Sequence, residues 1–169
     1  HRRPSRRCGL IAMPESPIIP SARAALAALD SYSSEALTAL RLKLAGSSFD
    51  VEQRAAHGFA WVETSIAAIH ALAAWHERLD AAGAVQKVDR LTLVIGMGEA
   101  LAQLIGGLPM GQNEIIRPLD IGAQAAAARL AADPAVQCLI EQGNCAANRA
   151  ALAALLADGA SISDRSGDE

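Results

Sequence analysis

Apolar residues recur at intervals of three or four along two long stretches of this chain. Such spacing gathers side chains on one face of an α-helix. Ser47 or Ser48 is a suitable N-cap for the first helix, and Gly83 ends it. The pattern predicts two long helices that share a core, with Trp75 buried against the second. The first stripe consists of Phe59, Val62, Ile66, Ile69, Leu72, Trp75 and Leu79, and the second of Val88, Leu91, Ile95, Gly98, Leu101, Ile105 and Leu108.

Shorter helices are predicted on both sides of this pair. Serines cap two of them near the start of the chain, and Gly46 ends the second. Asp133 caps a later helix that has Pro134 at its first position. Gly96 and Gly98 weaken a helix interior, so we expect them to mark a place where another helix comes close. The predicted short helices cover residues 21–29, 34–45, 123–132, 134–142 and 146–157.

Residues 106–122 read GGLPMGQNEIIRPLDIG and interrupt this helical pattern. Three glycines and two prolines before residue 119 forbid a continuous helix, so we expect a long connecting loop. Its polar groups lie between apolar anchors, which suits a segment that docks onto another surface. Docking across the chain's own helices is equally compatible with the pattern. The candidate docking residues are Met110, Gln112, Glu114, Arg117 and Asp120.

Composition supports a helical fold. The chain is 51% hydrophobic but only 3% aromatic, and alanine, the strongest helix former, dominates. The predicted fold is all-α, an up-and-down helical bundle with one long Gly/Pro-containing connecting loop. Residues 1–20 are expected to form an extended or disordered leader, 21–157 the helical domain, and 158–169 a polar tail or linker. Met13 resembles a natural start.

Charge and cysteine content exclude several classes of protein. The net charge is −3, and four of the 15 basic residues precede Met13, so the remainder is acidic and unsuited to nucleic acid. The longest apolar stretch contains Glu99 and Gln103, which argues against a membrane span. Three cysteines without metal or redox spacing fit a reducing cytoplasm. Cys138 and Cys145 are expected to pack as small apolar side chains.

No catalytic, cofactor-binding or metal-binding pattern is complete in this sequence. Residues 95–107 are glycine-rich, but Leu101 stands where the third glycine of a dinucleotide-binding loop belongs. Paired Glu-x-x-His motifs and a G-x-S-x-G motif are both missing. Glu99 lies in an apolar helix and is the one candidate general base, although pairing with Arg54, Arg90 or Arg117 is the commoner role for such a group.

Three segments resemble one family closely. They read AAHGFAWVETSIAAIHALAAWHERL (55–79), MGEALAQLIGGLPMGQNEIIRPLDIG (97–122) and DPAVQCLIEQGNCAANRAAL (133–152). Together they resemble the N-terminal helical region of (2S)-methylsuccinyl-CoA dehydrogenases, which are acyl-CoA dehydrogenase flavoproteins of the ethylmalonyl-CoA pathway. The resemblance covers about residues 34–155 and is most specific in GEALAQLIGGLPMGQNEIIRP.

The resemblance implies an accessory role. In that family FAD, the acyl-CoA and the catalytic glutamate belong to the enzyme body, so no catalytic residue carries over and Glu99 and Glu114 are not that glutamate. The expected partner of this chain is the dehydrogenase body or a second subunit, with FAD and acyl-CoA bound only in the full-length enzyme. The alternative is a stand-alone helical module that binds a partner or itself without catalysis.

Overall fold

A computed structural model of the chain describes residues 18–163. The fold is predominantly all-α, as predicted, with one short two-stranded sheet and one π-helical turn. The elements are α1 (Ile18–Ala45), α2 (Phe49–Ala81), α3 (Lys87–Gly106), β1 (Leu108–Gly111), β2 (Glu114–Ile116), α4 (Gln124–Ala132), α5 (Pro134–Cys138), the π-turn η1 (Leu139–Gly143) and α6 (Ala146–Ala157).

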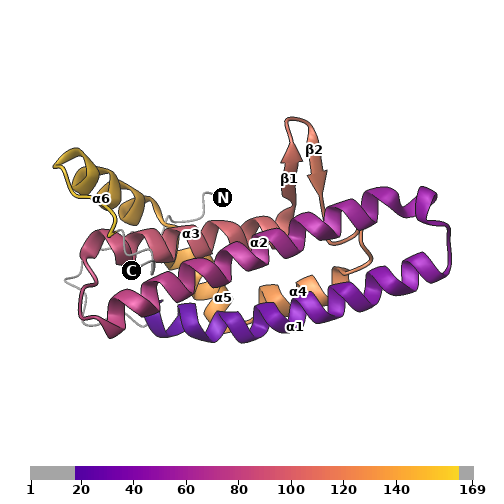
Figure 1. Ribbon diagram of the computed structural model, residues 1–169, viewed down its shortest axis with the longest axis horizontal. Helices are drawn as coiled ribbons and strands as arrows, with labels where there is room; N and C mark the ends of the chain where they lie inside the picture. Colours follow the sequence, from indigo (N-terminus) through magenta and orange to yellow (C-terminus); the bar gives the residue numbers. More distant parts are fainter. Residues whose placement is uncertain (1–17, 164–169) are drawn as a thin grey trace, which may run out of the picture.

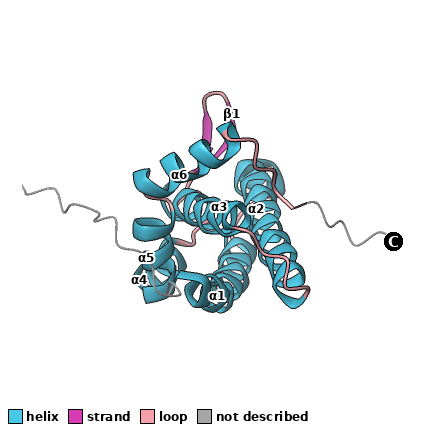
Figure 2. Ribbon diagram, turned by 90° about the vertical axis from the view of Figure 1, so that its left-hand side faces the viewer, coloured by secondary structure: helices cyan, strands magenta, loops and turns pink. Residues whose placement is uncertain are grey.

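Three long helices form the frame of the molecule. α1 and α2 lie side by side over their whole length, and α3 folds back against both (Figure 1, Figure 2). α4, α5 and η1 close the remaining side of the core, where they pack on α1 and α3. Both predicted stripes face this core in their central parts: Ile66 and Ile69 of α2 and Leu101 of α3 are at most 5% exposed.

The helix ends follow the local signals. Ser48 caps α2 and accepts a hydrogen bond from the Val51 N–H at 3.4 Å. Gly83, just after α2, has a φ of 62°, which suits glycine. The Asp133 side chain accepts hydrogen bonds from the N–H groups of Ala135 and Val136 at the start of α5. These three boundaries are confirmed.

The first two predicted helices are instead one continuous helix, α1. Serine hydroxyls in its middle do not cap new helices: the Ser31 hydroxyl donates to the Ala27 carbonyl at 3.0 Å, and the Ser33 hydroxyl donates to Glu63 of α2 at 2.8 Å. Leu29 and Tyr32 are buried there, and their packing keeps the helix intact. α1 also begins at Ile18, so the last three residues of the expected leader are helical, while residues 1–17 lie outside the described part.

The expected loop at residues 106–122 contains an antiparallel hairpin. Gly107, with a φ of 143°, ends α3, and Leu108 then pairs with Ile116 across β1 and β2. Both of these side chains are buried, and a two-residue turn at Gln112–Asn113 joins the strands. The register is irregular between Pro109 and Gly111, so the hairpin is short and stands away from the helices (Figure 1).

Glycines allow α3 and η1 to touch closely, as expected for Gly98. A Cβ on Gly98 would collide with the Leu139 carbonyl oxygen. From the other side, a Cβ on Gly143 would lie 2.7 Å from the Val94 carbonyl oxygen. The contact is therefore backbone against backbone.

α6 packs beside α3 and holds none of the buried residues (Figure 1). After it, Gly159 turns the chain back, and residues 160–163 return to the start of α3 rather than continuing as a free polar tail. Residues 164–169 lie outside the described part. Among the described helices, none combines the length and apolar character that a membrane crossing requires.

Candidate functional site

The base of the hairpin is fixed to α2 by one arginine and one glycine. Arg54 of α2 donates to the Glu114 carboxylate at 2.7 Å and to the Ile115 carbonyl at 2.8 Å. Four residues further along the same face, Gly58 leaves the space that the Ile116 side chain fills. The hairpin therefore projects from a fixed base.

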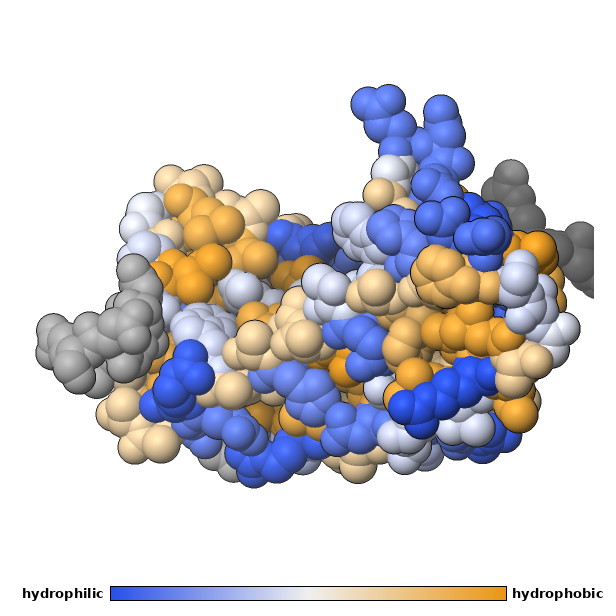
Figure 3. All heavy atoms as spheres, turned by 45° about the vertical axis from the view of Figure 1, so that its right-hand side comes forward, coloured by the Kyte–Doolittle hydropathy of each residue, from blue (hydrophilic) through white to orange (hydrophobic). Residues whose placement is uncertain are grey.

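The predicted docking residues divide between this base and the free end. Met110 is half-buried and packs against the core, so it anchors the hairpin to its own bundle. The Glu114 carboxylate is held by Arg54. Gln112 lies at the exposed turn, where Figure 3 shows a hydrophilic projection. Self-docking thus accounts for part of the segment, and its tip remains free for another surface.

Arg117 and Asp120 follow the hairpin. The backbone N–H of Arg117 donates to the Asp120 carboxylate at 2.7 Å, and Arg54 lies 3.8 Å from the same carboxylate. The Arg117 side chain is exposed and forms no ion pair within residues 18–163.

Glu99 is not the buried carboxylate that its apolar helix suggests. It is exposed, and it accepts hydrogen bonds from the side-chain amides of Asn144 at 2.6 Å and Gln103 at 3.0 Å. None of the three arginines considered as partners contacts it. Its position on the outer face of α3 explains the difference, since the apolar residues around it in sequence point the other way. The structure thus places Glu99 at the contact between α3 and the residue after η1.

The buried carboxylate of the described residues is Asp89, near the start of α3, with no exposed surface. Its two oxygens accept hydrogen bonds from the Ser163 N–H and hydroxyl, both at 2.9 Å, and from the Gln86 N–H at 2.9 Å. The Ser163 carbonyl in turn accepts a hydrogen bond from the Trp75 indole at 3.1 Å. We call Trp75, Gln86, Asp89 and Ser163 the C-terminal clasp.

The clasp depends on hydrogen bonding to a charged group. Burial alone raises the pKa of Asp89, but the backbone N–H groups of Ser163 and Gln86 and the Ser163 hydroxyl outweigh it, so the pKa lies below its ordinary value. Beside it, burial lowers the pKa of His76, against the opposing effect of Asp80. The clasp therefore favours the charged form of the Asp89 carboxylate.

Trp75 belongs to this clasp rather than to the centre of the core. It is half-buried, not buried against α3 as its place on the stripe predicts. The returning segment 160–163 contacts the indole instead, through the Ser163 carbonyl. The Gln86-x-x-Asp89 spacing, a capping-box pattern at a helix start, is the sequence signal for Asp89. Nothing local in the sequence points to Ser163.

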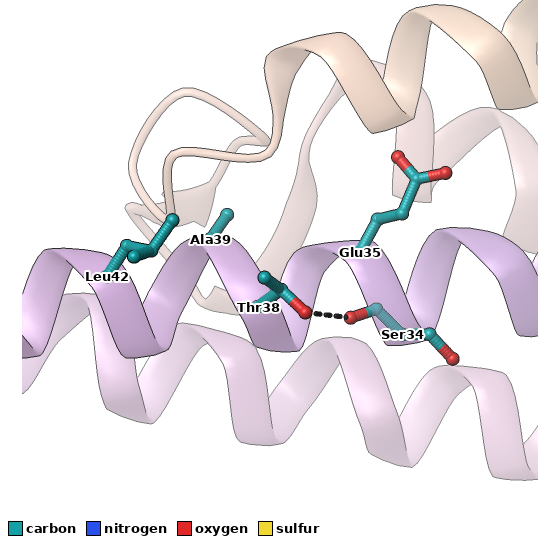
Figure 4. Close-up of a pocket in the computed structure, with 5 residues that line it drawn as sticks. All are labelled: Ser34, Glu35, Thr38, Ala39 and Leu42. Atoms are coloured by element: carbon teal, nitrogen blue, oxygen red, sulfur yellow. Dashed lines mark hydrogen bonds between the residues drawn. The ribbon is translucent and has the colours of Figure 1, made fainter.

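Hollows on the described surface are shallow. One lies on α1, with Glu35, Thr38 and Leu42 on its floor, and Glu35 is already paired with Arg129 of α4 (Figure 4). The Thr38 hydroxyl donates to the Ser34 carbonyl within the same helix. Within residues 18–163, no three His, Cys, Asp or Glu side chains gather as metal ligands would. Cys138 is half-buried and packs against the core, as expected; Cys145 is half-buried, and the two are not joined in a disulfide.

Comparison with known proteins gives one informative similarity. The chain is 38% identical over 116 residues to a (2S)-methylsuccinyl-CoA dehydrogenase of Cereibacter sphaeroides. The match takes in 69% of this chain but only 20% of that dehydrogenase. No protein-family profile matches the chain. The sequence resemblance is confirmed, and it supports a relationship to the acyl-CoA dehydrogenases.

Proposed function

We propose that this chain forms the helical accessory region of a longer flavin-dependent acyl-CoA dehydrogenase that acts in the cytoplasm. The observation that carries the proposal is the 38% identity to one fifth of a (2S)-methylsuccinyl-CoA dehydrogenase. By analogy, the complete enzyme oxidises a branched dicarboxylic acyl-CoA to an enoyl-CoA. The accessory region contributes binding surface to that enzyme rather than reacting groups.

Flavin belongs to the rest of that enzyme. FAD needs an enclosed site with donors for its pyrophosphate and its ring. The described residues do not form such a site for FAD. The hollow on α1 is open, and its one charged side chain, Glu35, is an anion that is already paired with Arg129. We therefore assign no flavin contact to residues 18–163.

We further propose that the hairpin is the contact between this region and the dehydrogenase body or a second subunit. Its base is fixed by Arg54 and Ile116, while Gln112 and Arg117 are exposed. Arg117 directly follows the hairpin at its base, and its exposed side chain forms no ion pair within residues 18–163. Arg117 is suited to a carboxylate on the partner, because a guanidinium binds a carboxylate through two parallel hydrogen bonds.

The proposed identity is tested by reading the natural gene beyond residue 169. A continuing frame that encodes acyl-CoA dehydrogenase motifs, and a full-length product that retains stoichiometric FAD, is the expected result. A natural stop codon directly after Glu169 leaves the stand-alone helical module instead. Purified 169-residue chain is the matched control and should carry no flavin.

The hairpin contact is tested with two arginine variants. Arg117→Ala should leave the urea midpoint of the 169-residue chain unchanged, because its side chain forms no ion pair with residues 18–163. Arg54→Ala should cost about 1 kcal/mol, since it breaks exposed contacts to Glu114 and Ile115. In the full-length enzyme, Arg117→Ala should weaken assembly or lower turnover. A large stability loss for Arg117→Ala in the short chain excludes the docking role.

A further inference from the structure

α6 is attached to the rest of the molecule differently from the long helices. None of its residues is buried, whereas α1, α2 and α3 each contribute seven or more buried residues. Its half-buried side chains are spaced as one helix face, and α3 is the long helix that α6 contacts (Figure 1). They are Asn148, Ala151, Leu152 and Leu155, and none belongs to the main hydrophobic core. The hydrophobic stabilisation of α6 is therefore small compared with that of the long helices.

The segment directly before α6 is firmly fixed. Leu139 of η1 is fully buried, and a Cβ on Gly143 would lie 2.7 Å from the Val94 carbonyl oxygen of α3. Asn144 and Cys145 then leave the helical conformation, with ψ angles of 43° and 159°. α6 thus begins just after a fixed point, and the two non-helical residues between η1 and α6 form its pivot.

Hydrogen bonds hold the two ends of α6. At its start, the Asn148 side-chain amide donates to the carbonyls of Gln142 and Gly143, both at 2.9 Å. Beyond its end, Gly159 has a φ of 88° and reverses the chain, which brings Ser163 into the C-terminal clasp. The bonds at the start are local and lie at the pivot. The clasp is therefore the contact that restrains the far end of this helix.

The clasp binds Ser163 through each of its polar groups. Its N–H and hydroxyl donate to Asp89, and its carbonyl accepts from the Trp75 indole. The hydroxyl also accepts a hydrogen bond from the Gln86 side-chain amide at 3.3 Å. Two of these four bonds end on a buried carboxylate, and hydrogen bonds to a charged group are stronger than those between neutral groups. The attachment of α6 is thus concentrated in one residue.

We propose that α6 and residues 158–163 form a hinged flap that opens as one unit at Cys145 and is latched by Ser163. Opening breaks the bonds of Ser163 and the contact between α6 and α3, but it leaves the hydrophobic core in place. Local units with few buried contacts open at a lower free energy than the whole molecule unfolds. The latch determines whether the polypeptide after Ser163 leaves from the start of α3 or moves with α6. This device does not depend on the proposed enzymatic role.

Amide hydrogen exchange of the 169-residue chain, resolved by residue, tests whether α6 opens by itself. The amides of α6 should exchange faster than those of core residues such as Ile69 and Leu101, and their rates should depend more weakly on denaturant, since opening exposes less surface. Ile69→Val weakens the core and should speed core exchange about two- to tenfold while α6 exchange stays at the wild-type rate. Exchange of α6 that is as slow as that of the core, or that rises equally in Ile69→Val, overturns the flap.

Two serine variants test the latch. Ser163→Ala removes the hydroxyl that donates to Asp89 and should raise the opening constant of α6 about tenfold. Ser161→Ala is the matched control, because it makes the same change two residues earlier, at an exposed side chain outside the clasp. It should leave the exchange of α6 at the wild-type rate. Equal exchange of α6 in the two variants overturns the role of Ser163 as the latch.

Discussion

Tyr32 and Asp89 are buried polar side chains with opposite hydrogen-bonding states. Asp89 has every oxygen occupied, whereas the Tyr32 hydroxyl has no hydrogen-bond partner among the described residues. Burial, together with the charge of Glu63, raises the pKa of Tyr32 to about 12. Its ring fills the core between α1 and α2, and its hydroxyl is desolvated without compensation.

Two replacements of Tyr32 separate the contribution of its ring to stability from that of its hydroxyl. Tyr32→Phe removes only the unpaired hydroxyl and should leave stability unchanged or raise it by up to about 1 kcal/mol. Tyr32→Ala removes the ring as well and should cost about 3–5 kcal/mol. Urea unfolding monitored by circular dichroism measures both values. A clear loss in Tyr32→Phe means that the hydroxyl has a partner in solution.

Acid should weaken the C-terminal clasp through Asp89. Its pKa is lower in the folded chain than in the unfolded chain, so its stabilisation is present above about pH 4 and is lost as the pH falls through the folded value. Asp89→Asn should therefore flatten the fall in stability below pH 4. Denaturant midpoints at pH 6, 4 and 3 measure this difference.

His76→Gln is the control for that experiment. Burial lowers the pKa of His76, so protonation of the unfolded chain costs stability from about pH 6.5 downward, before Asp89 titrates. The histidine variant should lose the pH dependence between about pH 7 and 5 and keep the part below pH 4. Identical acid profiles for wild type and Asp89→Asn contradict the role given to the clasp.

At the scale of elements, the hairpin is held by a fit between Gly58 and Ile116. A Cβ on Gly58 would collide with the Ile116 side chain, so Gly58→Ala should cost about 1–3 kcal/mol. Combined with Ile116→Ala, the loss should be smaller than the sum of the two single losses. Gly111→Ala is the control, since nothing lies within 4 Å of a Cβ there. Strictly additive losses rule out the direct fit.

Local signals predicted the elements that local chemistry determines. Ser48, Gly83 and Asp133 mark their helix ends through contacts within four residues of themselves. The sequence pattern gave the wrong helix boundary where a contact with a distant residue determines the structure. The Ser33 hydroxyl is used by Glu63, thirty residues away, so a cap signal became the interior of α1.

In the candidate site, too, locally determined features were predictable and features that depend on distant contacts were not. The special character of residues 106–122 was predictable from its glycines and prolines, but its hairpin was not, because Leu108 and Ile116 pair only when both reach the core. An acidic residue in an apolar helix was expected to be buried, yet Glu99 is exposed and Asp89 is buried. The rotation of α3 about its own axis, which is set by packing against η1 and α2, determines which of these two carboxylates is buried.

At the scale of the whole molecule, the folded unit extends to Ser163 rather than to Ala157. A chain that ends at residue 157 strands Asp89 and should lose at least about 1–3 kcal/mol relative to one that ends at residue 165. In a Trp61→Phe background, Trp75 is the remaining tryptophan, and its emission should shift to the red when segment 160–163 is missing. Equal stability and equal emission show that the segment is not bound.

The clasp at Ser163 also fixes the geometry of any tether that follows it. The hairpin starts at the far end of α3, which has 20 residues, so the two points are about 30 Å apart. A protein body that is attached after Ser163 and docks at the hairpin must itself span this distance. Otherwise it needs a flexible linker that is long enough to cover it. A rigid body that meets both conditions lies along the whole of α3, and the length of this one helix then sets the spacing between attachment and contact.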